Sequence, residues 1–147
     1  MKKVIMGVFL GLSILAVPIQ SSAHERQCPP TIDVTYEEAQ LLMEIASAEA
    51  LNQGPDGMRL VMSVVINRVN SPEYPNTIKE VIYQPYQFYT AGMKKAEITP
   101  EVHAALAELE MGNLTPEIIA FERGSSLDLF FTPVFTVKDH TFYVVQQ

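Results

Sequence analysis

The chain has 147 residues, a formal charge of −7 and a single cysteine. This length suits one domain that buries a single hydrophobic core. The excess of acidic residues disfavours binding to nucleic acid, because phosphates need basic partners. The lone cysteine, Cys28, excludes an intramolecular disulfide and a metal site built from several cysteines.

The N-terminus has the pattern of a secretory signal peptide. Lys2 and Lys3 precede an apolar stretch over residues 4–17, and small residues end at Ala23. The stretch is shorter than the roughly 20 residues that cross a bilayer. We therefore expect a signal peptide over residues 1–23, a secreted mature protein and no stable membrane span. Removing 23 of 147 residues leaves 124, and the loss of two lysines takes the formal charge from −7 to −9.

The mature chain begins with a leader and continues as one domain. Residues 24–34 have the composition of an extended segment, and residues 35–147 form the domain. Thr35 and Glu38 match a capping box, which predicts a helix over residues 35–52.

Three further helices are expected. A proline at a first helical position and an apolar stripe predict a helix over residues 55–70, which should pack against the first. A second capping pattern predicts a short helix over residues 77–82, and residues 83–98 look irregular. A helix over residues 100–112 follows, and residues 115–117 are expected to begin one more turn.

The C-terminal segment is expected to form strands. Residues 134–137 and 141–145 are rich in β-branched and aromatic side chains, and residues 138–140 would form the turn of a hairpin between them. The predicted fold class is thus α+β, mainly helical, with a small antiparallel hairpin.

Glu49 falls on the apolar stripe of the first expected helix. It is seven residues after Leu42 and therefore shares its face, on which Ile45 and Ala46 also lie. Burial disfavours the ionised form of a carboxyl group, which suits a general acid working near neutral pH. The alternative is that Glu49 lies at the rim of the stripe and extends into water or caps a neighbouring backbone.

A set of short motifs occurs in a fixed order along the chain. They are Ala48-Glu49-Ala50, Val64-Val65-Ile66-Asn67-Arg68-Val69, Ser71-Pro72, Tyr74-Pro75-Asn76-Thr77-Ile78, Val81-Ile82-Tyr83-Gln84-Pro85, Gln87-Phe88 and His140-Thr141-Phe142-Tyr143. In this order and spacing they resemble the SleB/CwlJ family of cell wall hydrolases, over roughly residues 37–143.

The resemblance implies a lysozyme-like fold, similar to the lytic transglycosylases, that cleaves peptidoglycan glycan strands with Glu49 as the catalytic acid. The sequence departs from the family after this acid, where Ala50-Leu51-Asn52-Gln53-Gly54 stands in place of Ala-Arg-Gly. The departure removes a basic side chain near the cleft, so binding could be weaker or altered. Many relatives carry a separate wall-binding domain, and we expect this chain to act as a monomer, alone or with an accessory wall-targeting protein.

Substrate binding is expected around an irregular stretch rich in amides and aromatic rings. Such groups suit hydrogen bonds to acetamido groups and stacking on sugar faces. The alternative is that Tyr83 and Phe88 belong to the core, while Gln84 and Gln87 satisfy loop backbone. Arg68 could pair with an acid in a structural role. The candidate binding residues are Tyr83, Gln84, Gln87, Phe88, Asn67 and His140.

A single acid is the better fit to the chemistry. Hydrolysis with two carboxylates needs a second acid roughly 5 to 9 Å away. Glu44 is about 140° around the helix from Glu49, and Asp56 falls in a first helical turn, where an acid favours the helix dipole. A lytic transglycosylase mechanism without cofactor or metal is therefore expected, since no paired histidine spacing and no Gly-x-Ser-x-Gly motif occurs.

Two other functions stay open. One is an amidase that cuts the bond between the muramoyl group and the peptide, and the other is an inactive wall-binding protein that keeps the fold. The substrate could be spore cortex or vegetative wall. Because both the protein and the wall are anionic, activity is expected to rise with moderate salt.

Overall fold

The computed structural model describes residues 32–92, 96–124 and 130–146. The expected signal peptide, most of the expected leader and Cys28 lie outside these ranges. Among the described helices, none is long and apolar enough to cross a membrane.

The first helix, α1, runs from Tyr36 to Ala50, and the capping box predicted for it is confirmed. The backbone nitrogen of Thr35 donates to the Glu38 carboxylate at 2.9 Å, and the backbone nitrogen of Glu38 donates to the Thr35 hydroxyl at 3.3 Å. The Thr35 hydroxyl also donates to the Glu38 carboxylate at 2.8 Å, and the two bonds that the carboxylate accepts from Thr35 lower the pKa of Glu38, because they favour its ionised form. A short 3₁₀ turn over Leu51–Gln53 then leads into the next helix.

The second helix, α2 (Gly54–Val69), forms the centre of the molecule. Ten of its residues are buried, and it contacts α1, α3 (Ile78–Tyr83) and α4 (Pro100–Glu110). Burial on all these sides explains why its apolar residues cover more than one stripe. The three expected helices after α1 are therefore confirmed, each with ends within two residues of the prediction.

Three strands form an antiparallel sheet in the order β1-β3-β2. The hairpin of β2 (Phe131–Val137) and β3 (His140–Val145) confirms the predicted pair, although its turn contains only Lys138 and Asp139. The strand β1 (Ala120–Arg123) was not predicted. It pairs with β3 from Ala120 opposite Tyr143 to Arg123 opposite His140.

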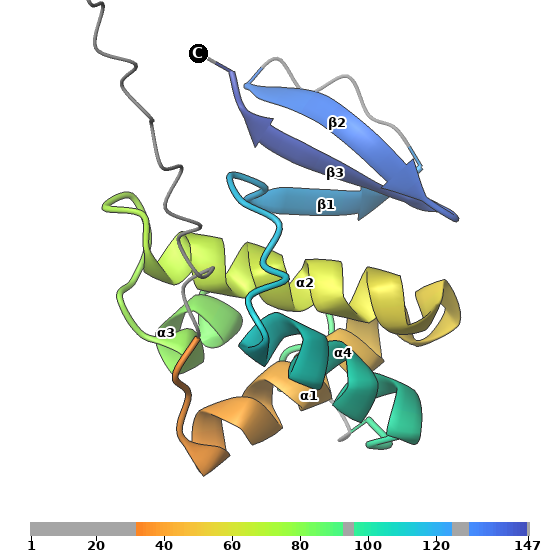
Figure 1. Cartoon of the computed structure of the whole chain (residues 1–147). Coiled ribbons are helices and arrows are strands. Elements are labelled where there is room, and N and C mark those ends of the chain that lie inside the picture. The colour runs from red at the N-terminus through yellow and green to blue at the C-terminus, as the bar shows by residue number, and fades with distance from the viewer. Residues whose placement is uncertain (1–31, 93–95, 125–129, 147) are drawn as a thin grey trace, which may run out of the picture.

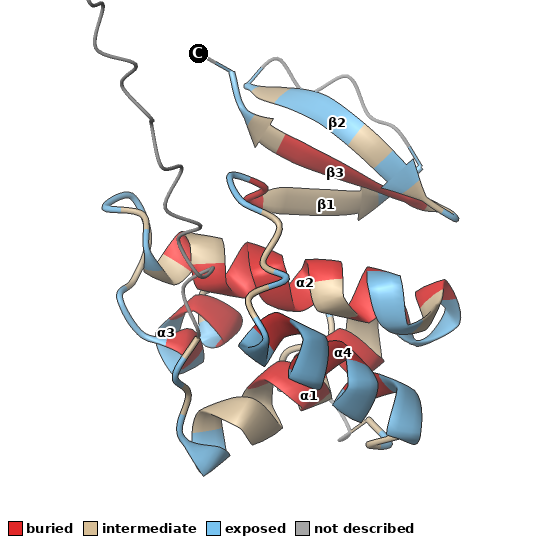
Figure 2. Ribbon diagram, in the orientation of Figure 1, coloured by how far each residue is buried: buried red, intermediate tan, exposed pale blue. Residues whose placement is uncertain are grey.

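The molecule has two layers with α2 between them. Figure 1 shows the sheet on one side of α2 and the other helices on the opposite side. The core on the helical side is continuous, and a second cluster of Leu60, Val64, Ile118 and Phe142 joins α2 to the sheet. Figure 2 shows that β3 is largely buried while β2 is mostly exposed.

The expected helical turn at residues 115–117 is wrong. This segment is extended or bent, and Glu117 has a φ of +66°. Side chains of α2 form hydrogen bonds to the backbone of this segment. Asn67 donates to the carbonyls of Thr115 and Ile118, both at 2.8 Å. Arg59 also donates to the hydroxyl of Thr115 at 3.1 Å. These tertiary contacts replace the bonds that a helical turn would have made.

Candidate active site

Glu49 lies in the last turn of α1, on the wall of a cavity of about 570 Å³. The cavity lies between the helical layer and the sheet, since its walls come from α1, from the irregular segment after α3 and from β1 and β3. Such a cleft between two layers is a common place for a ligand site. The residues around it are Ala48, Glu49, Tyr86, Gln87, Tyr89, Phe121, Glu122, Arg123 and His140.

Thr90 holds the carboxylate of Glu49 by one of its two oxygens. Its backbone nitrogen and its hydroxyl both donate to Oε1 of Glu49, at 2.9 and 2.6 Å. The other oxygen, Oε2, has no hydrogen-bond partner among the described residues. The arrangement fixes the orientation of the side chain and leaves one oxygen available to carry a proton to a ligand.

His140 is the first residue of β3 and is not in the hairpin turn, which corrects the expected position. It is buried, its ring packs on Phe121 with 5.4 Å between centroids, and its Nδ1 has no partner among the described residues. Burial lowers the pKa of His140, opposed by the nearby negative charges of Asp139 and Glu49. The site therefore presents a neutral imidazole near pH 7.

The cavity holds two charged residues that sequence reasoning missed. Glu122 is a second carboxylate that lines the cavity, and its Oε1 accepts a hydrogen bond from the hydroxyl of Tyr143 at 2.5 Å. Arg123 places a basic side chain at the cavity and pairs with Asp139 at 3.2 Å. Both lie on β1, a strand that was not predicted. The sequence indicated them only as a charged pair that follows the apolar run ending at Phe121.

The structure brings Glu49, Gln87 and His140 together and places the other expected binding residues elsewhere. Phe88 is 6% exposed and belongs to the hydrophobic core, so it does not reach the cavity. Asn67 is used in the two backbone hydrogen bonds to the segment before β1. The core alternative therefore holds for Phe88, while Gln87 is exposed at the cavity.

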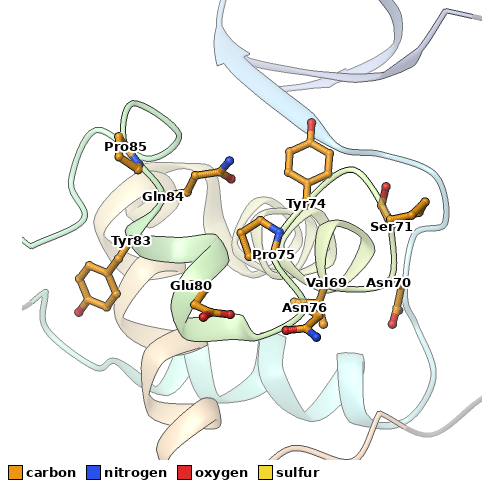
Figure 3. Close-up of a pocket in the computed structure, with 11 residues that line it drawn as sticks. Val69, Asn70, Ser71, Tyr74, Pro75, Asn76, Glu80, Tyr83, Gln84 and Pro85 are labelled. Carbon is orange, nitrogen blue, oxygen red and sulfur yellow. The ribbon is translucent and has the colours of Figure 1, made fainter.

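Tyr83 and Gln84 line a different cavity of about 980 Å³. Figure 3 shows the Gln84 amide and the Tyr74 ring approaching it from the end of α3 and from the loop after α2. The Oε1 atom of Gln84 is buried without a partner among the described residues. Glu49 does not line this larger cavity, so the larger volume does not identify the cavity as the reaction site.

Arg68 has a structural role, but no acid pairs with it in the described part of the chain. Its Nε donates to the carbonyl of Ile119 at 2.7 Å, and its guanidinium lies over the rings of Tyr74 and Phe88 at 5.1 and 5.2 Å. Burial lowers the pKa of Arg68. The side chain thus joins α2, the start of β1 and the irregular segment through cation–π contacts and one hydrogen bond.

The acids weighed from the sequence as partners of Glu49 do not share its cavity. Glu44 lines a separate cavity of about 240 Å³ with Tyr83 and Thr90. Asp56 is exposed in the first turn of α2. Within the described ranges, no group of three His, Cys, Asp or Glu residues is placed to hold a metal ion.

The model of the cell wall hydrolase family matches residues 52–143. A spore cortex-lytic enzyme of Halalkalibacterium halodurans is 31% identical over 74 residues, which are 50% of this chain and 22% of that protein. A spore cortex-lytic enzyme of Bacillus subtilis is 30% identical over 73 residues, which are 50% of this chain and 24% of that protein. The matched segments thus span less than a quarter of either relative.

The catalytic domain of the Bacillus cereus SleB protein has a similar structure. The TM-score is 0.63 at 18% identity, and the similarity covers 82% of this chain and 98% of that domain. The resemblance to the SleB/CwlJ type and the expected fold are both confirmed. The family match begins at Asn52, after Glu49, so the assignment of the acid depends on the geometry of the cavity.

Proposed function

Because the chain belongs to the cell wall hydrolase family, we propose that it is a secreted enzyme that cleaves the glycan strands of peptidoglycan as a lytic transglycosylase. The bond cut is the β-1,4 bond between N-acetylmuramic acid and N-acetylglucosamine. The observation that carries the proposal is the carboxylate of Glu49, held at one oxygen by Thr90 on the wall of a cleft between two layers.

Glu49 acts first as an acid and then as a base. Its proton passes to the glycosidic oxygen as the bond to the anomeric carbon breaks, so that the leaving sugar departs with a 4-hydroxyl group. The carboxylate then takes the proton from the 6-hydroxyl of the muramic acid, whose oxygen attacks the anomeric carbon. The product is a 1,6-anhydro sugar, and no water is consumed.

Gln87 and His140 are proposed to bind the substrate, because both line the cavity of Glu49. The exposed amide of Gln87 can donate to and accept from an acetamido group. The imidazole of His140 is neutral near pH 7 and can pack against a sugar ring in the cavity, whereas its Nδ1 is buried and is not the atom that would meet a hydroxyl.

Hydrolysis with two carboxylates is the second candidate, and Glu122 favours it. This acid lines the same cavity as Glu49, from the side of the sheet. In that mechanism Glu122 would either take a proton from the attacking water molecule or attack the anomeric carbon itself. The product would have a reducing end in place of the anhydro ring.

Mass spectrometry of the fragments released from purified peptidoglycan tests these mechanisms. We expect the protein to release anhydro-muropeptides and Glu49→Gln to release none. Glu44→Gln is the matched control, because this acid lies on the same helix beside another cavity. Spore cortex and vegetative wall should be digested in parallel, since either could be the substrate.

Each other result points to a different function. Fragments with reducing ends, lost in Glu122→Gln, would establish two-carboxylate hydrolysis. Free peptides would indicate an amidase, and binding to both walls without fragments would indicate an inactive wall-binding protein.

A further inference from the structure

Two tyrosines stand exposed at the cavity of Glu49. The exposed fraction of Tyr86 is 103% and that of Tyr89 is 84%, and both line the cavity. They flank Gln87, and Tyr89 directly precedes Thr90, which holds the acid. Phe88 between them turns into the core, which anchors the segment that carries both exposed rings.

The backbone of Tyr86 is strained. Its φ is +65°, in the left-handed region that glycine adopts freely and that a side chain with a Cβ disfavours. The fully exposed ring does not offset this strain by packing in the fold. Backbone strain of this kind clusters at functional sites, where the surrounding structure maintains it.

We propose that Tyr86 and Tyr89 form an aromatic rim that stacks on sugar rings of the glycan strand and positions it over Glu49. This inference rests on the proposed function. The C–H face of a pyranose ring is apolar and packs against an aromatic face, and tyrosine offers a large rigid surface with few rotatable bonds. Tyr89 would hold a sugar near the acid, and Tyr86 would hold one farther along the segment.

Stacking also suits the charges of the two partners. The chain has a formal charge of −7, and peptidoglycan carries carboxylates, so long-range attraction does not bring them together. Contact between an aromatic ring and a sugar face does not depend on the sign of either charge. The rim therefore supplies affinity that the net charge of the protein cannot.

The test is co-sedimentation with purified peptidoglycan sacculi, using Glu49→Gln as the parent so that binding is measured without turnover. Adding Tyr86→Gly should weaken binding about tenfold, a factor that corresponds to about 1.4 kcal/mol. Because glycine relieves the backbone strain, the unfolding midpoint should stay the same or rise. Tyr89→Ala should also weaken binding, with an unchanged unfolding midpoint.

The matched control is Glu117→Gly. Glu117 is also exposed, also has a left-handed backbone (φ +66°), and lines none of the cavities described above. Its replacement should leave binding unchanged. In the active protein, Tyr86→Gly should raise KM for solubilised glycan strands about tenfold and change kcat less than twofold.

The outcomes separate the two proposals. If the parent binds sacculi and both tyrosine variants bind as tightly as Glu117→Gly, the aromatic rim is wrong and the proposed function stands. If the parent binds neither cortex nor vegetative sacculi, both proposals are overturned.

Discussion

Thr90 fixes the carboxylate of Glu49 through two hydrogen bonds to the same oxygen. Thr90→Val keeps the shape of the side chain and the backbone donor but removes the hydroxyl donor at 2.6 Å. A hydrogen bond between uncharged groups contributes about 0.5 to 1.5 kcal/mol. Loss of this bond should lower kcat by up to about tenfold, because the acid is oriented less well towards the glycosidic oxygen.

Initial rates of fragment release measure this effect. Thr90→Ser keeps the hydroxyl and should retain a rate within about threefold of the unchanged protein. A valine variant as active as the serine variant would contradict the orienting role of Thr90.

His140 makes the stability of the fold depend on pH. Burial lowers the pKa of His140 in the folded state, while an unfolded histidine titrates near about 6.5. At pH values between this pKa and the lower pKa of the folded state, the unfolded chain binds up to one proton more than the folded chain does. The free energy of unfolding should therefore fall as pH drops from neutral, by up to about 1.4 kcal/mol per pH unit.

Urea unfolding at pH 7.5 and 5.5 checks this prediction. His140→Gln should lose less stability between these two pH values than the unchanged protein does. His103→Gln, at an exposed position of α4, should keep the full pH dependence. An equal loss in all three proteins would show that other groups cause it.

Neighbouring residues show how far the sequence could predict the site. The apolar stripe drew attention to Glu49 but left open whether it extends into water, and the resemblance to the family made it the expected acid. No such period governs the irregular segment, so the sequence could not distinguish exposed Gln87 from buried Phe88. Glu122 was missed because a strand places it at the cavity, and that strand was not expected.

At the scale of elements, Asn67 connects α2 to the segment that leads into β1. Its side-chain nitrogen donates to the carbonyls of Thr115 and Ile118. Asn67→Ala leaves both carbonyls without this donor and should lower the free energy of unfolding by about 2 kcal/mol. Because β1 carries part of the cavity wall, activity should fall as well.

Chemical denaturation measures the loss, and Asn113→Ala is its control. Asn113 is exposed, and within the described ranges its side-chain amide makes one long hydrogen bond, of 3.4 Å, to Glu108. This variant should change stability by less than about 0.5 kcal/mol. A similarly small effect in Asn67→Ala would show that the segment keeps its place without the amide.

The helices could be predicted because local signals agree with the tertiary structure. Thr35 and Thr77 cap α1 and α3 as the sequence indicated, with hydrogen bonds inside each first turn. The strand β1 has four residues and depends on pairing with β3, which is about twenty residues farther along the chain. Such a short element has no local signal of its own. The side chains of α2 that fix its start are even farther away, 51 residues before the carbonyls they bind.

At the scale of the whole molecule, the site is a product of the two-layer arrangement. The helical layer supplies Glu49, and the sheet supplies His140, Glu122 and Arg123. Neither layer forms the cavity alone. Contacts that join the layers, such as Arg68 with the carbonyl of Ile119, therefore influence the geometry of the site without touching a ligand.

The net charge of the molecule should make its rate on peptidoglycan depend on the salt concentration. With a formal charge of −7, or −9 without residues 1–23, the protein is repelled by an anionic wall at low salt. The Debye length falls from about 30 Å at 0.01 M to about 8 Å at 0.15 M ionic strength, so the repulsion is screened over this range. The initial rate on peptidoglycan should rise severalfold, because encounter becomes faster. Peptidoglycan whose carboxylates have been amidated serves as the control and should show little salt dependence. A rate that falls steadily with salt would instead mean that attraction between opposite charges, such as that of Arg123 on the cavity wall for the carboxylates of the substrate, dominates binding.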